Sequence, residues 1–455
     1  MEPLSSDVVV IGAGCAGLAA AVRLAAAGRK VVVVEQAPRL GGRATAFTDR
    51  ESGDRVDNGQ HVLFGCYRET YAFLEAIGAS HLAPLQSRLA VGMADGTGRR
   101  SRLTCPGWAP PPWHLALGVL GWGALPIVDR LSVLRFGSLL RAARVDGAAA
   151  VASRVPPDVT VAEWLADQGQ SETIRDWLWH PLAIAALNQS PDIAAAAPFV
   201  RVLCEMFGPS VEDSAIGLPI VPLDALYAEP ARAFVEARGG VVLQKVAARI
   251  ETTESGVPIG VEAGGLRIAT AAVVSAVPWH AFASLWPRGV PPALSVIAAN
   301  ATAMDASPIV TVNLWFEERV TLGDRFVGLI GGPLHWVFDK GALYAHDAGH
   351  LSVVASGATE LSRLDNADAT KVALSQLQQA LPALAGCTLK RSVVVREPRA
   401  TFSLAPGGPP RPAHRTPIAN FFLAGDWTDT GLPATIEGAV QSGHVAADAV
   451  LAVPS

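Results

Sequence analysis

The sequence predicts an α/β protein in which the two ends of the chain build one domain and the middle builds a second. A strand–turn–helix–strand pattern opens the chain, and a strand–loop–helix pattern closes it. The chain has 455 residues, which is more than one hydrophobic core usually supports. A second domain is therefore expected between the two patterns.

The opening pattern occupies residues 6–36, SDVVVIGAGCAGLAAAVRLAAAGRKVVVVEQ. Gly12, Gly14 and Gly17 form a G-x-G-x-x-G turn, which allows a tight bend, close approach of a pyrophosphate and close helix packing. Glu35 ends the second strand, where a carboxylate can bind the hydroxyls of an adenosine ribose. The unit predicts a Rossmann-like dinucleotide site with contacts from Gly12, Gly14, Ala16, Gly17, Glu35 and Gln36.

A second glycine pair follows in residues 37–47, APRLGGRATAF. Gly41 and Gly42 let the backbone approach phosphate groups, and Arg43 adds a fixed cation. This segment resembles the extended FAD signature of the amine oxidase and phytoene desaturase superfamily, which an NAD dehydrogenase has no reason to carry. The resemblance implies that the dinucleotide is FAD.

The closing pattern occupies residues 421–451, FFLAGDWTDTGLPATIEGAVQSGHVAADAVL. It predicts a buried strand, a loop through Gly425-Asp426, and a helix that begins near Pro433 to Ile436. In the superfamily it resembles, the Gly-Asp pair contacts the ribityl-phosphate region, and the helix start stabilises negative charge at the pyrimidine end of the flavin. No cysteine lies near the Gly-Asp pair, so a non-covalent FAD is expected. The resemblance implies contacts from Gly425, Asp426, Thr435, Ile436, Glu437 and Gly438.

The segment 239–251, GGVVLQKVAARIE, predicts a strand, and the resemblance places Val246 near its middle, where backbone groups meet the adenine. The FAD-binding domain is therefore expected to be discontinuous, and the remaining segments are expected to build a mixed α+β substrate-binding domain. No second nucleotide fingerprint occurs in the latter, so the chain encodes no separate NAD(P)H domain. The predicted boundaries are 1–89, 219–278 and 393–455 for the FAD-binding domain, and 90–218 and 279–392 for the substrate-binding domain.

The composition is apolar for a soluble enzyme, with 50% hydrophobic and 17% charged residues and a mean hydropathy of +0.31. A net charge of -5 gives no reason to expect nucleic acid as a partner. The five cysteines lie far apart and form no C-x-x-C pair, which argues against disulfides or zinc and favours a cytoplasmic location. No basic residue precedes Val8, so the apolar opening is explained by the first strand rather than by a signal peptide.

An apolar stretch at residues 113–128, WHLALGVLGWGALPIV, is too short to span a bilayer and is broken by glycine and proline. The surrounding residues 99–144 carry seven arginines against one acid, Asp129. An apolar stretch flanked by arginines and tryptophans predicts helices near 113–144 that lie on anionic lipid, at the inner face of the cytoplasmic membrane. A buried helix pair with solvated ends explains the same composition equally well.

The segment 57–70, DNGQHVLFGCYRET, contains an isolated histidine, His61. In the related flavoenzymes the matching segment approaches the isoalloxazine ring and the substrate cavity, so Gly59, Gln60 and His61 are candidates for cofactor contact. His61 is also the candidate general acid, with positioning or packing as the alternative. A metal site is not expected, because His346 and His350 are the only comparable pair and the residues between them favour a turn.

Four collinear segments narrow the resemblance: DNGQHVLFGCYRET, PLAIAALNQSP, GLPIVPLDALYAEPARAFVEARGG and AGDWTDTGLPATIEGAVQSG. Together they resemble the hydroxysqualene dehydroxylase family of hopanoid biosynthesis over nearly the whole chain. The resemblance implies that hydroxysqualene, a triterpene alcohol, and reduced FAD give squalene, water and oxidised FAD. It also implies an electron donor that reduces the FAD, which the sequence does not identify.

For this reaction we hypothesise that an acid protonates the allylic hydroxyl, that water leaves, and that the resulting delocalised cation accepts a hydride. Aromatic faces stabilise cations, so Trp177, Trp179 and Trp427 are candidates for substrate contact, although tryptophans are more often core residues.

Two other functions fit the same motifs. An oxidative isoprenoid or carotenoid desaturase of the phytoene type would run hydride toward FAD in the same fold, and the sequence does not fix the direction. A non-catalytic isoprenoid carrier is the remote alternative, and the intact glycine motifs with Glu35 and Asp426 argue against it.

Overall fold

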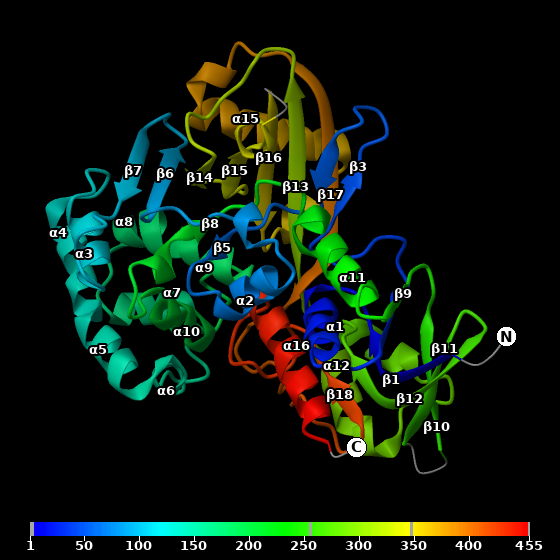
Figure 1. The fold of residues 1–455 in the computed structure, drawn as a ribbon. Helices are drawn as coiled ribbons and strands as arrows, with labels where there is room; N and C mark the ends of the chain where they lie inside the picture. The colour runs from blue at the N-terminus through cyan, green and yellow to red at the C-terminus, as the bar shows by residue number, and fades with distance from the viewer. Residues whose placement is uncertain (1–3, 254–256, 346–348, 454–455) are drawn as a thin grey trace.

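Two seven-stranded sheets and a helical lobe make up the fold (Figure 1). The computed structural model describes residues 4–253, 257–345 and 349–453. His346 lies outside the described residues, as do the first three and last two residues of the predicted FAD-binding segments.

The first sheet unites both ends of the chain. Its strand order is β10-β11-β12-β1-β2-β9, and β18 pairs in parallel with the second half of β12. The sheet thus collects strands from all three predicted FAD-binding segments. The strands are β1 (Leu4–Ile11), β2 (Val31–Val34), β9 (Val241–Leu243), β10 (Ala248–Thr252), β11 (Pro258–Ala263), β12 (Leu266–Ser275) and β18 (Phe421–Leu423).

Valine runs make the central strands of this sheet, because each face is covered. Val8 and Val10 pack against helix α1 (Cys15–Ala26), whereas Val9 and Ile11 pack on the opposite face against η6 (Trp279–Leu285). The final helix, α16 (Ile436–Leu451), lies beside α1. Alanines and glycines on α1 and α16 allow their backbones to approach closely, since a Cβ at Gly443 would stand 2.1 Å from the Ala16 carbonyl oxygen.

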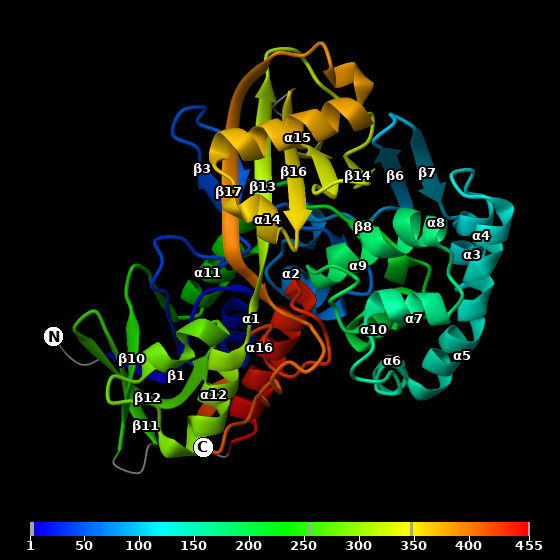
Figure 2. The same ribbon diagram turned by 180° about the vertical axis from the view of Figure 1, so that it is seen from behind.

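The second sheet has the order β17-β13-β16-β15-β14-β6-β7 and is antiparallel except where β14 meets β6. Helix α15 (Asn366–Ala380) covers the face that carries Val310, Val312 and Leu314 (Figure 2). The strands are β6 (Ala90–Asp95), β7 (Arg100–Thr104), β13 (Ala306–Phe316), β14 (Phe326–Ile330), β15 (Trp336–Asp339), β16 (His350–Ser356) and β17 (Leu389–Phe402).

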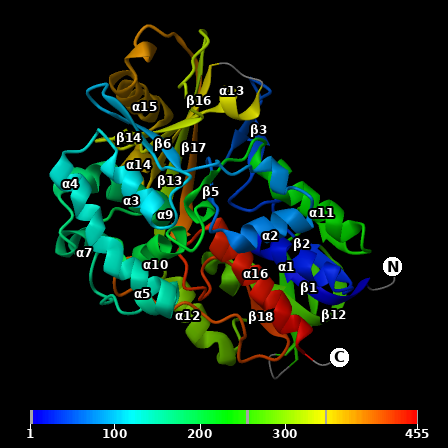
Figure 3. The same cartoon turned by 60° about the vertical axis from the view of Figure 1, so that its left-hand side comes forward.

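The helical lobe follows β7 and packs around aromatic residues, among them Trp122, Phe136, Trp164 and Phe199. Figure 3 brings this lobe forward, with α3, α4 and α5 on its outer side. The segment 160–188, which has helical spacing, forms α7, α8, η3 and α9. The bounds are α3 (Trp113–Leu120), α4 (Ile127–Ser132), η2 (Val133–Phe136), α5 (Gly137–Asp146), α6 (Ala148–Ala152), α7 (Val161–Asp167), α8 (Glu172–Ile174), η3 (Arg175–Trp179, a π-helical turn), α9 (His180–Leu187) and α10 (Ala196–Met206).

Short elements connect these three parts. β3 and β4 form a small hairpin, and β5 pairs with the distant β8 in a second two-stranded antiparallel sheet. The remaining bounds are β3 (Ala46–Thr48), β4 (Arg55–Asp57), β5 (Leu63–Phe64), β8 (Ile216–Gly217), α2 (Arg68–Ala76), η1 (Ser80–Leu82), η4 (Glu212–Ser214), η5 (Asp224–Ala228), α11 (Glu229–Glu236), η7 (Pro292–Leu294), α12 (Ser295–Ala303), α13 (Lys340–Tyr344), α14 (Thr359–Arg363) and η8 (Pro382–Leu384).

The structure differs from the predicted domain boundaries at two places. Residues 279–304 pack against the first sheet through Trp279, Phe282 and Met304, because an uncovered parallel sheet would expose its valines. Residues 393–402 belong to the second sheet, because β17 pairs with β13 along most of its length.

Candidate active site

A continuous cavity of about 1120 Å³ runs from the first sheet into the helical lobe. One half is lined by glycine turns and polar groups at the ends of the parallel strands, and the other half by aromatic and aliphatic side chains of the lobe. Crevices at the carboxyl ends of parallel strands are the usual nucleotide sites of such sheets. The polar half therefore has the position of a dinucleotide site.

The first glycine turn has the geometry that its sequence predicts. Gly12 adopts φ +103°, and a Cβ at Gly17 would stand 1.9 Å from the Gly12 carbonyl oxygen, so neither position accepts a larger side chain. The Glu35 carboxylate accepts hydrogen bonds from the amides of Ala13 and Ala37, both at 2.7 Å. The cavity wall includes Gly12, Gly14, Ala16, Glu35 and Gln36, whereas Gly17 serves packing behind it.

The second glycine turn lies directly against the first, where the Gly41 amide donates to the Ala13 carbonyl at 2.8 Å. Gly41 and Gly42 both have positive φ and both line the cavity. The buried Tyr227 hydroxyl lies 2.6 Å from the Gly41 carbonyl oxygen and 2.7 Å from that of Ala44, which holds the turn from behind. Tyr227 could not be predicted from the sequence, since only the tertiary fold brings it to this turn.

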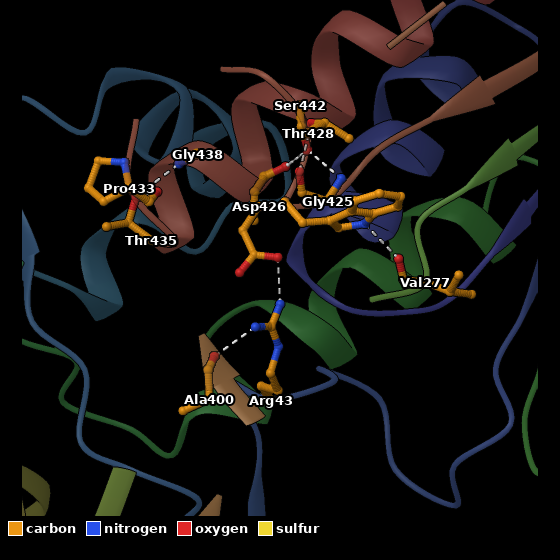
Figure 4. Close-up of polar contacts among 12 residues, drawn as sticks. Arg43, Val277, Ala400, Gly425, Asp426, Thr428, Pro433, Thr435, Gly438 and Ser442 are labelled. Carbon is orange, nitrogen blue, oxygen red and sulfur yellow. Dashed lines mark hydrogen bonds and ion pairs between the residues drawn. The ribbon is translucent and has the colours of Figure 1, made fainter. Parts of the chain in front are cut away.

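Arg43 connects the second glycine turn to the closing motif (Figure 4). Its guanidinium group donates to the Asp426 carboxylate at 2.6 Å and to the Ala400 carbonyl at 2.7 Å. Asp426 is buried, and both charged side chains line the cavity. The two glycine-rich motifs predicted from opposite ends of the chain thus meet at one ion pair.

The loop that carries Gly425 and Asp426 is fixed by neighbouring hydroxyl groups, as Figure 4 shows. The Gly425 amide donates to Ser442 Oγ, and Thr428 Oγ1 donates to the Gly425 carbonyl, both at 2.7 Å. Trp427 is fully buried, does not line the cavity, and donates to the Val277 carbonyl at 2.9 Å. The prediction that Trp427 contacts substrate is wrong, because its ring packs in the core behind the first sheet.

Helix α16 begins at the cavity, where the Gly438 amide donates to Thr435 Oγ1 at 3.1 Å. Thr435 and Ile436 line the cavity, but Gly438 and Glu437 do not. The Glu437 carboxylate accepts from the Glu69 and Thr70 amides at 3.0 and 2.9 Å, so it caps helix α2 instead of facing a cofactor. Burial raises the pKa of this carboxyl group. The predicted cofactor contact of Glu437 is corrected accordingly.

Val246 lines the cavity but lies in the bend between β9 and β10, not within a strand as predicted. The strand is interrupted because Lys245 adopts φ +61°. The Val246 amide donates to the Glu35 carbonyl at 3.0 Å, which joins the bend to the end of β2.

All four residues from Asn58 to His61 line the cavity, and the Asn58 side-chain amide donates to the Arg43 carbonyl at 3.0 Å. His61 Nδ1 lies 2.7 Å from the Gly59 carbonyl oxygen. Because a carbonyl only accepts, Nδ1 carries the hydrogen, and in the neutral ring Nε2 is then an acceptor. Burial lowers the pKa of His61, while the Gly59 carbonyl and Asp57 oppose this effect. His61 can therefore donate a proton from Nε2 only in its imidazolium form.

The apolar half of the cavity has aromatic walls. Trp177 and Trp179 both line it, as their candidate role requires, and Trp177 packs edge to face on Trp122 at 6.0 Å. Further rings on the wall were not singled out from the sequence, because aromatic residues at these positions look like core residues: Phe64, Tyr67, Trp122, Phe136, Phe207, Phe326, Trp336 and Phe338.

The described residues contain no group of three or more histidine, cysteine or acidic side chains arranged to hold a metal ion.

Comparison with known proteins gives three findings. Residues 15–451 match the family model of flavin-containing amine oxidoreductases. The chain is 31% identical to a hydroxysqualene dehydroxylase from Rhodopseudomonas palustris over 99% of both chains, and 27% identical to a 15-cis-phytoene desaturase from Narcissus pseudonarcissus over 98% of this chain and 79% of that one. Among solved structures, an oxidoreductase from Methanosarcina mazei superposes with a TM-score of 0.76 at 17% identity, covering 97% of this chain and 100% of that chain.

Proposed function

The chain belongs to the flavin-containing amine oxidoreductases and, within them, to the hydroxysqualene dehydroxylase family, and we propose that it reduces hydroxysqualene to squalene. It is an FAD-dependent oxidoreductase, as the sequence predicts. The observation that carries the proposal is a full-length relative of that activity at 31% identity, combined with a long apolar cavity that begins at the cofactor site.

The residues of the polar half fit FAD. Gly12, Gly41 and Gly42 leave a backbone cradle without side chains, and the start of α1 offers unpaired amides to a pyrophosphate. Glu35 stands where a ribose would bind, and Arg43 and Asp426 form an ion pair on the cavity wall. These residues would hold the cofactor, which supplies a hydride when bound in its reduced state.

We propose that the FAD is held without a covalent bond. The cysteines on the described cavity wall are Cys15 and Cys105. Burial raises their pKa values to about 11 and about 12, so both are neutral thiols at physiological pH. A neutral, buried thiol is a poor nucleophile for flavin attachment.

The substrate hydroxyl group would lie beside His61, where the polar and apolar halves meet. Protonated His61 would donate its Nε2 proton to the hydroxyl oxygen, and the C–O bond would break with release of water. Trp177 and Trp179 would stabilise the allylic cation through their ring faces and exclude bulk water from it. Hydride addition to the cation then gives squalene.

We further propose that the helical lobe lies on the membrane surface. None of the helices in the described ranges combines the length and the apolarity that a bilayer crossing requires. The outer side of the lobe nevertheless exposes large apolar side chains, including Trp108, Ile127 and Val128 at 82%, 69% and 79%. Trp113, Leu134, Arg141 and Arg144 line the cavity from this same side, so the cavity reaches the exposed patch. Such a patch supports direct transfer of a triterpene from a bilayer into the cavity.

The test is anaerobic. Purified enzyme is reduced with dithionite, hydroxysqualene is added, and flavin absorbance and squalene are followed together. Stoichiometric squalene with reoxidised flavin supports the dehydroxylase. An oxidative desaturase gives the opposite pattern. Its reduced flavin is not reoxidised by hydroxysqualene, whereas its oxidised flavin is reduced, and loses its visible absorbance, when a polyene precursor is added. A colourless protein with no flavin would leave only an isoprenoid carrier.

A further inference from the structure

A buried ion pair lies immediately beside the segment Asn58 to His61 and takes no part in the mechanism above. The Lys340 ammonium group lies 2.7 Å from the Asp57 carboxylate, and the two residues are 1% and 4% exposed. Lys340 begins helix α13, and Asp57 ends strand β4, directly before Asn58. The Tyr344 hydroxyl donates to the same carboxylate, and the Leu223 amide donates to its other oxygen at 3.1 Å.

Such a pair is costly, because both ions lose their hydration. A hydrophobic pair of similar volume would stabilise this part of the core as well or better. Burial lowers the pKa of Lys340, whereas the Asp57 carboxylate favours the charged ammonium group. The cost points to a role for the ammonium group beyond packing.

Lys340 also donates to Gln60 Oε1 at 2.6 Å. An ammonium group has no acceptor, so this contact fixes which end of the Gln60 amide faces the lysine. The amide nitrogen, Nε2, must then face the other way. Gln60 is only 8% exposed and lines the cavity beside His61, and its Nε2 is buried with no hydrogen-bond partner among the described residues.

We propose that Lys340 is a positioning residue that fixes the Gln60 carboxamide, so that its NH2 group donates a hydrogen bond to an oxygen atom bound in the cavity. A buried donor without a partner is unfavourable, and a ligand oxygen relieves that cost. Two sources supply an oxygen acceptor at this place: a carbonyl group of the flavin, and the hydroxyl group of the substrate. The second source rests on the proposed function, and the first does not.

The direct test is Gln60→Glu, which keeps the size of the side chain and an oxygen toward Lys340 but replaces the NH2 donor by an acceptor. The matched control is Gln189→Glu. Gln189 is also 8% exposed, and its amide contacts Ser403 and Leu404 rather than the cavity. The control measures the cost of burying a carboxylate in this fold.

Each variant is examined as holoenzyme for its flavin absorbance spectrum, its flavin reduction potential and the rate of a single turnover with hydroxysqualene. If the donor serves the flavin, Gln60→Glu shifts the spectrum and lowers the potential, and Gln189→Glu does neither. If it serves the substrate, the potential stays unchanged and the single-turnover rate falls by about tenfold or more, the effect of one hydrogen bond. Spectrum, potential and rate all equal to those of Gln189→Glu would overturn the proposal.

Lys340 is tested in the double variant Asp57→Asn with Lys340→Met, which removes both buried charges together and avoids leaving one of them unpaired. The Gln60 amide is then free to rotate, so the readout moved by Gln60→Glu is expected to move in the same direction. If Gln60→Glu changes the spectrum, the potential or the rate, but the double variant leaves all three at their wild-type values, Lys340 has no positioning role. If hydroxysqualene fails to reoxidise even the wild-type enzyme, the proposed function fails, and the spectrum and potential alone decide the role of Gln60.

Discussion

The Arg43 guanidinium group and the Asp426 carboxylate lie 2.6 Å apart, although 383 residues separate them in the chain. This pair ties the second glycine turn to the loop before α16, and both residues line the polar half of the cavity. Its two members come from the second glycine turn and the closing motif, so this wall of the cavity is complete only when both ends of the chain have folded together.

Replacing Asp426 with leucine is expected to weaken FAD binding by about tenfold or more, because Arg43 then keeps a partly buried charge without its carboxylate. Fluorescence titration of the apoprotein with FAD gives the dissociation constant. The control is Asp448→Leu, which removes an exposed ion pair with Arg23 outside the cavity and is expected to leave FAD affinity unchanged. Equal affinities for the two variants would contradict the role assigned to Asp426.

The rate of single turnover is expected to fall as pH rises through the pKa of His61. Only the imidazolium form has a proton on Nε2, and burial lowers the pKa of this ring below its ordinary value of 6.5. The acid-active form is therefore a minority at neutral pH, and the rate should increase toward acidic pH. Stopped-flow measurements of flavin reoxidation between pH 5 and 8, in about half-unit steps, give the profile.

His61→Gln should lower this rate by roughly a hundredfold and abolish the pH dependence, since glutamine cannot supply the proton. His280→Gln is the matched control, because His280 also lines the cavity but lies near Arg399 rather than Asp57. An undiminished rate in His61→Gln would return His61 to a packing role.

Glu437 is expected to matter for stability and not for the cofactor. Glu437→Ala removes the carboxylate that caps α2 through Glu69 and Thr70, and loss of a helix cap costs about 1–2 kcal/mol of unfolding free energy. Chemical denaturation measures that loss, and the flavin spectrum should remain that of wild type. For comparison, Thr435→Val alters a residue on the cavity wall and should change the spectrum. A spectral change in Glu437→Ala would restore the cofactor contact that the sequence suggested.

The sequence predicted the βαβ unit correctly because the residues that define it lie close together in the chain. Valine runs, the glycine turn and Glu35 all fall within 31 consecutive residues, and each feature has one structural meaning there. Val246 was misplaced because a single residue with positive φ, Lys245, ends the strand without any glycine or proline to signal it.

Residues that depend on distant partners were misjudged or missed. Glu437 lies at the start of a helix that faces the cavity. Its side chain nevertheless points away from the cavity and binds Thr70, which is 367 residues away in the chain. The sequence gives no sign that separates Trp427 from Trp177: both are buried, but only Trp177 lines the cavity. Lys340 was not singled out at all, because an isolated lysine is normally a surface residue and its partner Asp57 is 283 residues away.

The helical lobe is expected to bind anionic vesicles, and binding should weaken as salt increases. The exposed patch carries Ile127 and Val128 on α4, and the arginines Arg141 and Arg144 on α5 stand beside the cavity that opens there. Insertion of apolar side chains resists salt, whereas attraction of the arginines to lipid phosphates is screened over about 10 Å at 0.1 M salt. Vesicle sedimentation across a salt series separates the two contributions.

Replacing both Ile127 and Val128 with aspartate should abolish sedimentation with vesicles, while Arg141→Gln with Arg144→Gln should leave weaker binding that depends less steeply on salt. Ile259→Asp is the matched control, because Ile259 is a large apolar side chain that is 43% exposed on β11 of the first sheet, apart from the lobe. Turnover of hydroxysqualene in vesicles should follow vesicle binding in all three variants. In detergent, the aspartate variant and Ile259→Asp should turn over near the wild-type rate, because the exposed patch delivers substrate and does not act on it. The arginine variant is left out of the detergent comparison, because Arg141 and Arg144 line the cavity. If the aspartate variant sediments with vesicles at the wild-type level, α4 does not contact the lipid and the proposed membrane surface is wrong.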